Sequence, residues 1–553
     1  MSLLKNNLWV SILLFLILII SLFVRFYKLD VVPNGFHIDE AIIADNANFI
    51  LNTGRDTNNN FLPLQTEVFG DYNPTGYAYL AIAPIKILGL TIFAARSVGA
   101  FLGALAVIGV FFLAYSIFEK KRISLLASLF TALSPWGIAL SRSTEQTAAS
   151  LVFIIFGFAL LVWSVKKEKI LYLLVAVLLL FISYFMYFTP RLFVPLIFLL
   201  FFAPLRYWYE KRKTVFLKVF IGCFLFLAIA SFVLVFGTSG GSNRFNQVSI
   251  FGFPETKLVM EEQIREDGGT TTPIILTRIF HNKILNYSLT YVQNYLEYFT
   301  GGFLFIEGGR PIWLNVSRVG LVYIIELPFI IYGLYLLVKE KKKWGFLVLG
   351  WLLIAPMVAS LTVDDIPNTR RALVMVPVLE ILAAYGVINF LESLSKRIRV
   401  IGVSILALLF ILNSLYFFHQ YFVHTTIHQN WYRNEGFEQM MSVVKKDYSN
   451  VDKIVVSKSS GGNYPLILFY MNYSPSMYLK EGHTKDKAYT GFGKFFFVDA
   501  ACPSIDKDSK FPNVKNTIYI DDGNCRNYKT LKIKKHIFIY RKDGTKVFRI
   551  VYN

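Results

Sequence analysis

Long apolar runs are the feature that most constrains how this chain can fold. A run of about 20 apolar residues is long enough for a helix to cross the hydrocarbon core of a bilayer. The chain of 553 residues is 55% hydrophobic and only 17% charged, which is too apolar for a water-soluble globule. The sequence therefore predicts an α-helical polytopic membrane protein with about 11 transmembrane helices, from the runs at about 8–26, 92–118, 123–140, 145–165, 170–188, 191–208, 214–236, 318–338, 344–362, 371–391 and 399–418.

The first run is better interpreted as a retained helix than as a signal peptide. Its apolar stretch, Leu8 to Val24, is long and lacks a small-residue cleavage site, and further apolar runs follow it.

Basic residues in the short connections predict the orientation. A formal net charge of +20 would suggest nucleic acid as a partner of a soluble protein, but here much of the charge lies between apolar runs. Cytoplasmic loops carry an excess of Lys and Arg. With a cytoplasmic N-terminus, all the basic connections face the cytoplasm, so we expect a multi-pass cell-membrane protein, an extracytoplasmic C-terminal domain and no nucleic-acid partner. The basic connections are 119–122, 166–169, 210–213, 339–343 and 396–399.

Three large segments then face away from the cytoplasm: a first loop at 27–91, a middle loop at 237–317 and everything after 418. The first loop contains a second apolar run, 74–89, which is short for a span and is predicted to be an interfacial or re-entrant helix. Residues 1–418 are thus expected to form the transmembrane domain, and residues 419–553 a separate outer domain.

The outer domain is predicted to be α/β. Apolar and polar residues alternate in "DKIVVSK", "KFFFVDA", "NTIYIDDG" and "HIFIYRKDGTKVFRIVYN", and the last stretch predicts a hairpin with a turn at Asp543 and Gly544. "EGFEQMMSVVKKDY" has helical spacing. Its excess of basic residues suits either contact with lipid head groups or glycans, or plain solvation. Cys502 and Cys525 could form a disulfide or stay reduced.

An acidic pair, Asp39 and Glu40, follows the first span in "NGFHIDEAIIADNANFILNTGR". The spacing predicts a helix that ends at Gly54, with both carboxylates in its first turn. The helix dipole favours carboxylates there, so the pair could stabilise the helix or carry chemistry.

Several stretches resemble one family of membrane enzymes. They are the acidic pair, "DYNPTGYAYLAIAPIKILGLTIFAARSVGAFLGALAVIGVFFLAYSIF", "LSPWGIALSRSTEQTAASLVF", "YFTPRLFVPL", "RIFHNKILNYSLTYVQNYLEYFTGGFLF", "VGLVYIIELPFIIYGLYLL" and "DDIPNTRRALVMVPVLEILAAYG". Together they resemble the membrane glycosyltransferases of the C-type (GT-C) fold, in the protein O-mannosyltransferase and aminoarabinose transferase group. The resemblance implies transfer of a sugar from a polyprenyl-phosphate donor to an acceptor on the outer face, with inversion of the anomeric centre.

The resemblance also implies roles for acidic residues. Asp39 matches the family's first-loop Asp and is the expected general base, and Glu40 is expected to orient it or the acceptor. Asp71 and Glu145 are further candidates for binding substrate, although each could be an ordinary loop or helix-end carboxylate. Asn73 stands before Pro74 where aminoarabinose transferases tend to have Lys, which speaks against that donor.

A departing phosphate needs positive charge. Arg142, Arg191, Arg370 and Arg371 all lie on the outer side by the loop count, against the usual bias of basic residues, so they are candidates for binding it. Interfacial snorkelling is the alternative explanation. Adjacent carboxylates can also bind a divalent metal ion, but no spacing here demands one.

The residues leave other choices open. The sugar could be a hexose or a pentose, and the acceptor a glycan, a lipid or a protein. Glu326 and Glu380 lie inside predicted spans, where carboxylates are costly and often functional. They favour the rival prediction of a multi-span transporter or lipid flippase, whereas the odd span count and large outer segments argue against it.

Overall fold

The computed structural model describes residues 8–203, 214–270, 272–341, 344–428, 430–458, 463–481, 490–506, 514–526 and 535–553. The chain divides into two compact units. The helical unit comprises Met1–Tyr27, Asp71–Pro74 and Gly99–Gln420, and the mixed unit comprises Lys28–Gly70, Thr75–Val98 and Tyr421–Asn553. The predicted domain boundary at 418 and 419 stays a prediction, and part of the first loop belongs to the same compact unit as the C-terminal residues. The basic segment 210–213, as well as Lys342 and Lys343, lies outside the described residues.

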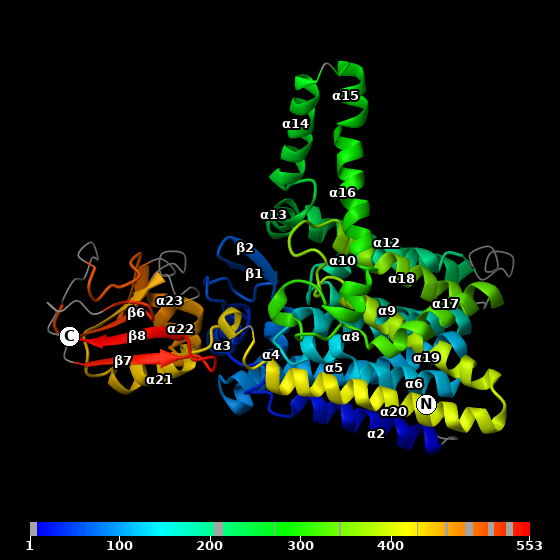
Figure 1. The fold of residues 1–553 in the computed structure, drawn as a ribbon, viewed down its shortest axis with the longest axis horizontal. Coiled ribbons are helices and arrows are strands. Elements are labelled where there is room, and N and C mark those ends of the chain that lie inside the picture. Colours follow the sequence, from blue (N-terminus) through cyan, green and yellow to red (C-terminus); the bar gives the residue numbers. More distant parts are fainter. Residues whose placement is uncertain are drawn as a thin grey trace. The chain divides into compact units, whose positions relative to one another are not determined.

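Long apolar helices dominate the chain (Figure 1). Within the described residues, six are long and apolar enough to cross a membrane: α2 (Leu8–Phe26), α5 (Ile92–Phe118), α8 (Gln146–Lys167), α12 (Thr214–Phe236), Leu373–Ser393, which contains α19 (Val376–Ser393), and Lys396–His424, which contains α20 (Lys396–His419). A seventh span is formed if α6 (Lys121–Leu133) and α7 (Pro135–Ser141), bent by 52°, count as one. The polytopic membrane fold is thereby confirmed, while the number 11 stays a prediction.

The remaining helices are shorter. The predicted interfacial run forms α4 (Gly76–Leu88), a helix of 13 residues. The others that precede the C-terminal residues are α9 (Ile170–Ser183), α10 (Thr189–Leu200), α13 (Ser239–Val248), α14 (Pro254–Gly269), α15 (Ile274–Phe280), α16 (Lys283–Glu297), α17 (Leu327–Glu340) and α18 (Gly345–Ser360).

Small residues let the helices of the bundle pack closely. A Cβ atom on Gly386 of α19 would lie 2.0 Å from the carbonyl oxygen of Phe329 on α17, which no real side chain can do. Such close backbone approach is typical of helix packing in membranes, where van der Waals contact replaces the hydrophobic effect. Glu326 and Glu380 are both buried in this helical unit.

The mixed unit contains α3 (Ile38–Thr53), α4 and a six-stranded sheet. The strand order is β4-β5-β3-β6-β8-β7, from β3 (Lys453–Ser457), β4 (Gly491–Phe492), β5 (Phe495–Val498), β6 (Thr517–Asp522), β7 (Lys535–Tyr540) and β8 (Lys546–Tyr552). β3 pairs in parallel with β5 and β6, and the other pairings are antiparallel. With α21 (Phe437–Asp447), α22 (Asn463–Met471) and α23 (Pro475–Lys480), this confirms the predicted α/β character.

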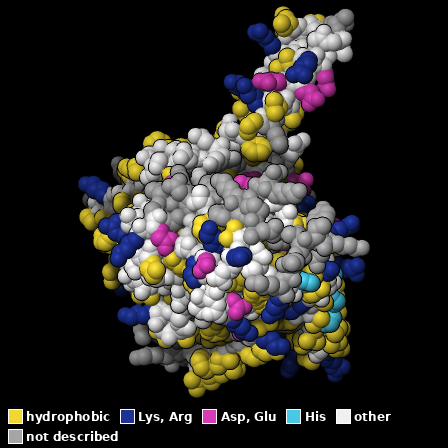
Figure 2. Space-filling model, turned by 90° about the vertical axis from the view of Figure 1, so that its left-hand side faces the viewer, with side chains coloured by type: hydrophobic (Ala, Val, Ile, Leu, Met, Phe, Trp, Pro, Cys, Tyr) yellow, Lys and Arg dark blue, Asp and Glu magenta, His cyan; other side chains and the backbone are white. Residues whose placement is uncertain are grey.

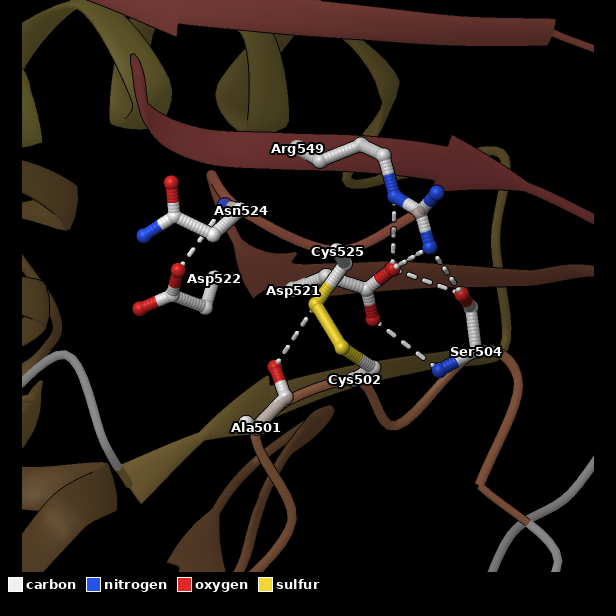
Figure 3. Close-up of a disulfide and its surroundings, with 8 residues drawn as sticks. All are labelled: Ala501, Cys502, Ser504, Asp521, Asp522, Asn524, Cys525 and Arg549. Atoms are coloured by element: carbon white, nitrogen blue, oxygen red, sulfur yellow. Dashed lines mark hydrogen bonds and ion pairs between the residues drawn. A yellow bond between two sulfur atoms is a disulfide. The ribbon is translucent and has the colours of Figure 1, made fainter. Parts of the chain in front are cut away.

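Two local predictions for the C-terminal residues are resolved by the structure. The β7–β8 hairpin turns through Asp543 and Gly544, where the amide of Gly544 donates to the carbonyl of Arg541 at 3.0 Å. Cys502 and Cys525 form a disulfide with 5.8 Å between their Cα atoms (Figure 3). Beside it, the fully buried Arg549 pairs with Asp521 at 2.7 Å.

Strands β1 (Gln65–Val68) and β2 (Asp71–Pro74) belong to the first loop.

Candidate active site

The helix that carries the acidic pair begins and ends as its sequence predicts. α3 runs from Ile38 to Thr53 and ends at Gly54, whose φ of 70° is the left-handed conformation that glycine adopts without strain. At its start, the ring of His37 accepts a hydrogen bond from the amide of Asp39, and the carboxylate of Glu40 accepts one from the amide of His37. This reciprocal capping box satisfies amides that would otherwise lack partners.

Glu40 is buried in an ion pair. Its two carboxylate oxygens lie 2.9 and 3.0 Å from Nε and a terminal nitrogen of Arg96, and Arg433 approaches to 3.4 Å. The Arg96 side chain is 0% exposed and also donates to the carbonyl of Pro33 and of Gly35, in the segment that leads into α3. Because a buried charge is stable only with good partners, this network fixes the start of α3.

Asp39 differs from its neighbour in being open to solvent. Its side chain is 47% exposed, and a carboxylate oxygen lies 3.5 Å from Nδ1 of His37. That nitrogen accepts the Asp39 amide in the capping box, which requires the neutral ring, so the contact becomes an ion pair only when His37 is protonated. The Asp39 carboxylate is therefore accessible to solvent in the first turn of a capped helix.

The helical unit contains a cavity with a charged end and an apolar wall. Arg244, Arg371 and Thr362 line it together with apolar side chains that include Leu192 and Val358. A second cavity shares Leu192 and Val358 and continues along α10 and α18. Guanidinium groups beside an apolar groove suit an anion with a long hydrocarbon tail.

Both arginines of this cavity are held by carboxylates. Arg371 makes a bidentate pair with Asp364, with both N–O distances 2.8 Å, and Arg244 lies 2.5 Å from Asp71. Burial alone would raise the pKa of Asp364, but the hydrogen bonds and charge of Arg371, with the nearby charge of Arg244, lower it below its usual value. Asp364 therefore stays ionised and holds Arg371 in place.

A further ion pair joins two of the segments that carry the family resemblance. Glu145, at the start of α8, lies 3.1 Å from Arg370, which stacks over the ring of Trp313. At Thr369, the residue before Arg370, the backbone carbonyl accepts a hydrogen bond from the indole nitrogen of Trp136 at 2.9 Å. The "LSPWGIALSRSTEQ" and "PNTRRAL" segments, far apart in the sequence, therefore pack together.

Comparison with known proteins agrees with this architecture. Residues 72–236 match the protein family described as dolichyl-phosphate-mannose-protein mannosyltransferase. ArnT from Cupriavidus metallidurans bound to undecaprenyl phosphate is 12% identical, with a TM-score of 0.55 over 98% of each chain. The chain has the C-type glycosyltransferase (GT-C) fold.

A second GT-C structure gives the same result over less of its length. The oligosaccharyltransferase AglB from Archaeoglobus fulgidus, in complex with an inhibitory peptide and a dolichol-phosphate, is 14% identical with a TM-score of 0.51. The match covers 84% of this chain, which spans 64% of the length of that protein. No curated protein sequence matches this chain. The predicted resemblance to the GT-C enzymes is thereby confirmed at the level of the fold.

Two of the predicted phosphate-binding residues of this GT-C chain are engaged by backbone carbonyls. Arg142 is buried and donates to the carbonyls of Val24, Arg25 and Tyr27, the last turn of α2 and the residue after it. Arg191 is buried and donates to the carbonyls of Tyr184 and Leu234. Capping carbonyls at helix ends is a structural role that needs no ligand, so their part in substrate binding stays a prediction.

Sequence reasoning missed Arg96, Arg244 and Asp364. Arg96 lies near the start of a predicted span, and Arg244 follows the end of another on the predicted outer side. Both are cations at positions that the positive-inside rule disfavours, which is the signal that selected the other arginines.

Among the described residues, no group of three or more His, Cys, Asp or Glu side chains could hold a metal ion. The mechanism proposed below uses none.

Proposed function

We propose that this GT-C protein transfers a sugar from a polyprenyl-phosphate carrier to an acceptor on the outer face of the cell membrane. The observation that carries the proposal is the cavity of the helical unit, where Arg244 and Arg371 meet an apolar wall. A phosphate that bears a polyprenyl chain has the same two properties, a strong anion and a long apolar tail. ArnT, which matches over nearly the whole chain, is bound to undecaprenyl phosphate in its structure.

In this proposal, Arg244 and Arg371 bind the carrier phosphate, and the second cavity accommodates the first isoprene units. Arginine is suited to the phosphate because its planar group donates two parallel hydrogen bonds. Asp71 and Asp364 hold the two guanidinium groups in place, so less side-chain freedom is lost when the phosphate binds. The pair of Glu145 and Arg370 fixes the loop that precedes α19.

Asp39 is the proposed general base. Its carboxylate takes the proton of the acceptor hydroxyl as that oxygen forms a bond to the anomeric carbon. The bond between that carbon and the phosphate oxygen breaks from the opposite side, so the configuration inverts. Positive charge at the phosphate stabilises the leaving group. Glu40 acts by positioning: its pair with Arg96 fixes the helix that carries Asp39.

The decisive experiment replaces Asp39 with Asn in the full-length protein in nanodiscs. Sugar transfer from a polyprenyl-phosphate donor is expected to fall by at least a hundredfold, because general bases contribute about 10²–10⁴ in rate. The matched control is Asp30→Asn, another exposed first-loop carboxylate, which should leave transfer unchanged. Turnover within a few-fold of wild type for Asp39→Asn would remove Asp39 as the base.

Mass spectrometry of surface glycans, lipids and glycoproteins, with and without the gene, identifies the sugar and the acceptor. Loss of one sugar from one class of molecule is expected. Unchanged glycans combined with altered uptake of a solute would instead favour the transporter alternative, for which Glu326 and Glu380 are the relevant residues.

A further inference from the structure

A helical arm projects from the helical unit. It consists of α14, α15 and α16, described over residues 254–270 and 272–297. Polar contacts hold its helices together: Asn286 of α16 donates to the carbonyl of Thr256 on α14, and His281 lies 3.3 Å from Asp267 and 3.1 Å from Gln263 of α14. The arm is therefore a defined element with its own internal contacts, and it contributes to the proposed function only through Tyr291 of α16, which lines the second cavity.

The arm runs crosswise to the spans of its own unit. In Figure 1 its helices stand upright while α2 and α20 run across the view. Figure 2, turned by 90° about the vertical axis, again shows the arm rising away from the body. Because spans run roughly along the membrane normal, an element crosswise to them extends along the membrane plane.

The contacts of α16 with α18 indicate how deep in the membrane the base of the arm lies. Asn294 donates to the carbonyls of Ser360 and Thr362, at the end of α18 nearest the Asp364–Arg371 pair. The hydroxyl of Tyr295 donates to the carbonyl of Leu353 at 2.9 Å. Leu353 lies about two helical turns, or about 10 Å, further along α18. The base of α16 is thus at the depth where interfacial helices bury their apolar side.

The helices of the arm differ in chemistry. α14 carries five carboxylates, whereas α15 carries none and α16 only Glu297. α14 also exposes Leu258, Val259 and Ile264, at 57%, 49% and 38%, but the apolar side chains of α15 and α16 are more numerous and more exposed, with Ile275 at 70% and Ile284 at 81%. The exposed apolar residues of α15 and α16 are Ile274, Ile275, Leu276, Ile279, Phe280, Ile284, Leu289, Val292 and Leu296.

On α16 the exposed apolar residues form one stripe. At 3.6 residues per turn, Ile284, Leu289, Val292 and Leu296 fall within about 140° of the helix circumference. Arg278 and Lys283, the cations of α15 and α16, lie close in sequence to these exposed apolar residues, so they can meet phosphate head groups.

We propose that α15 and the apolar side of α16 lie in the lipid leaflet at the Asp364–Arg371 end of the bundle, with the acidic α14 on the water side. Lipid is the occupant that suits a stripe contacting the apolar helix α18 at this depth and running along the membrane plane. The stripe is then continuous with the exposed apolar surface of α18, on which Leu353 is 56% exposed.

Spin labelling in lipid nanodiscs tests this arrangement. Cysteines replace Ile284, Val292 or Leu296, and Glu262 of α14 serves as the matched control, in a Cys223→Ala background that keeps the Cys502–Cys525 disulfide. Each nitroxide is exposed to oxygen, which concentrates in lipid, and to a water-soluble nickel chelate. We expect oxygen to dominate at the three stripe positions and nickel at position 262.

Two results would overturn the proposal. Nickel accessibility at positions 284 and 292 equal to that at 262 would place the stripe in water. Protection from both reagents, together with cross-linked dimers through these cysteines, would show that a second copy of the chain covers it. The measurement needs no sugar transfer, so loss of the proposed function leaves this inference standing, and the reverse also holds.

Discussion

At the scale of single residues, the environment of each carboxylate decides what it can do. Asp39 and Glu40 are neighbours in sequence, yet one is about half exposed and the other is buried against Arg96. An exposed carboxylate can exchange protons with an acceptor, whereas one that neutralises a buried arginine costs several kcal/mol to disturb. This difference supports the proposed roles of Asp39 as base and Glu40 as positioning residue.

Asp45, also on α3, provides a prediction on pH. It is 2% exposed, burial raises its pKa well above the usual value, and its Oδ2 accepts no hydrogen bond from the described residues. Above about pH 4, the unfolded chain loses this proton while the folded chain keeps it, so stability falls as pH rises towards the folded pKa. Asp45→Asn should therefore raise the thermal unfolding temperature more at pH 8 than at pH 5. An equal change at both values would contradict the raised pKa.

Arg244 provides a test of carrier binding. Arg244→Gln removes a charged donor from the cavity but leaves a partly exposed site that water can fill. Loss of one charge-assisted hydrogen bond is worth about 1.5–3 kcal/mol, so the affinity for undecaprenyl phosphate should fall about tenfold or more. Titration of the purified protein in nanodiscs measures this. Arg265→Gln, on α14 and away from the cavity, is the control, and equal affinities in the two variants would exclude Arg244 from the site.

At the scale of elements, α3 depends on an ion pair that its own sequence does not reveal. The capping box and Gly54 define the ends of the helix, but Arg96 of α5 anchors it to the rest of the mixed unit. Helical stability in proteins comes mostly from such tertiary contacts.

Breaking the ion pair between Glu40 and Arg96 should lower the stability of the protein, whereas sugar transfer by the molecules that stay folded should change less. Glu40→Gln leaves Arg96 buried without its counter-charge, which costs about 3–5 kcal/mol. We expect a lower unfolding temperature for Glu40→Gln and for Arg96→Gln, and a double variant less destabilised than the sum of the two. Thermal unfolding in detergent measures all three. A Glu40→Gln protein that unfolds like wild type but transfers no sugar would show that Glu40 takes part in the reaction directly.

At the scale of the whole molecule, the orientation across the membrane is the main prediction. The basic connections favour a cytoplasmic N-terminus, and the Cys502–Cys525 disulfide favours an oxidising compartment for the C-terminal residues. Both arguments predict that the C-terminal sheet lies outside the cell.

Thiol labelling in intact cells tests this orientation. In a Cys223→Ala background, a membrane-impermeant maleimide should label Lys542→Cys in intact cells. Arg122→Cys, in a basic connection and 72% exposed in its native side chain, should be labelled only after permeabilisation. The reverse pattern would invert the topology and remove the argument for a lipid-borne donor.

The sequence by itself determined the membrane class, the C-terminal strands with their β7–β8 hairpin, and the bounds of α3. These features depend on local composition, periodicity and capping, which are properties of neighbouring residues. Only the tertiary structure decided that Arg142 and Arg191 cap carbonyls, that Arg244 and Arg371 share a cavity, and that Glu40 is buried. The partners of these charged side chains are distant in sequence. Only the tertiary structure therefore shows whether each charge binds groups of the protein itself or remains accessible to a ligand.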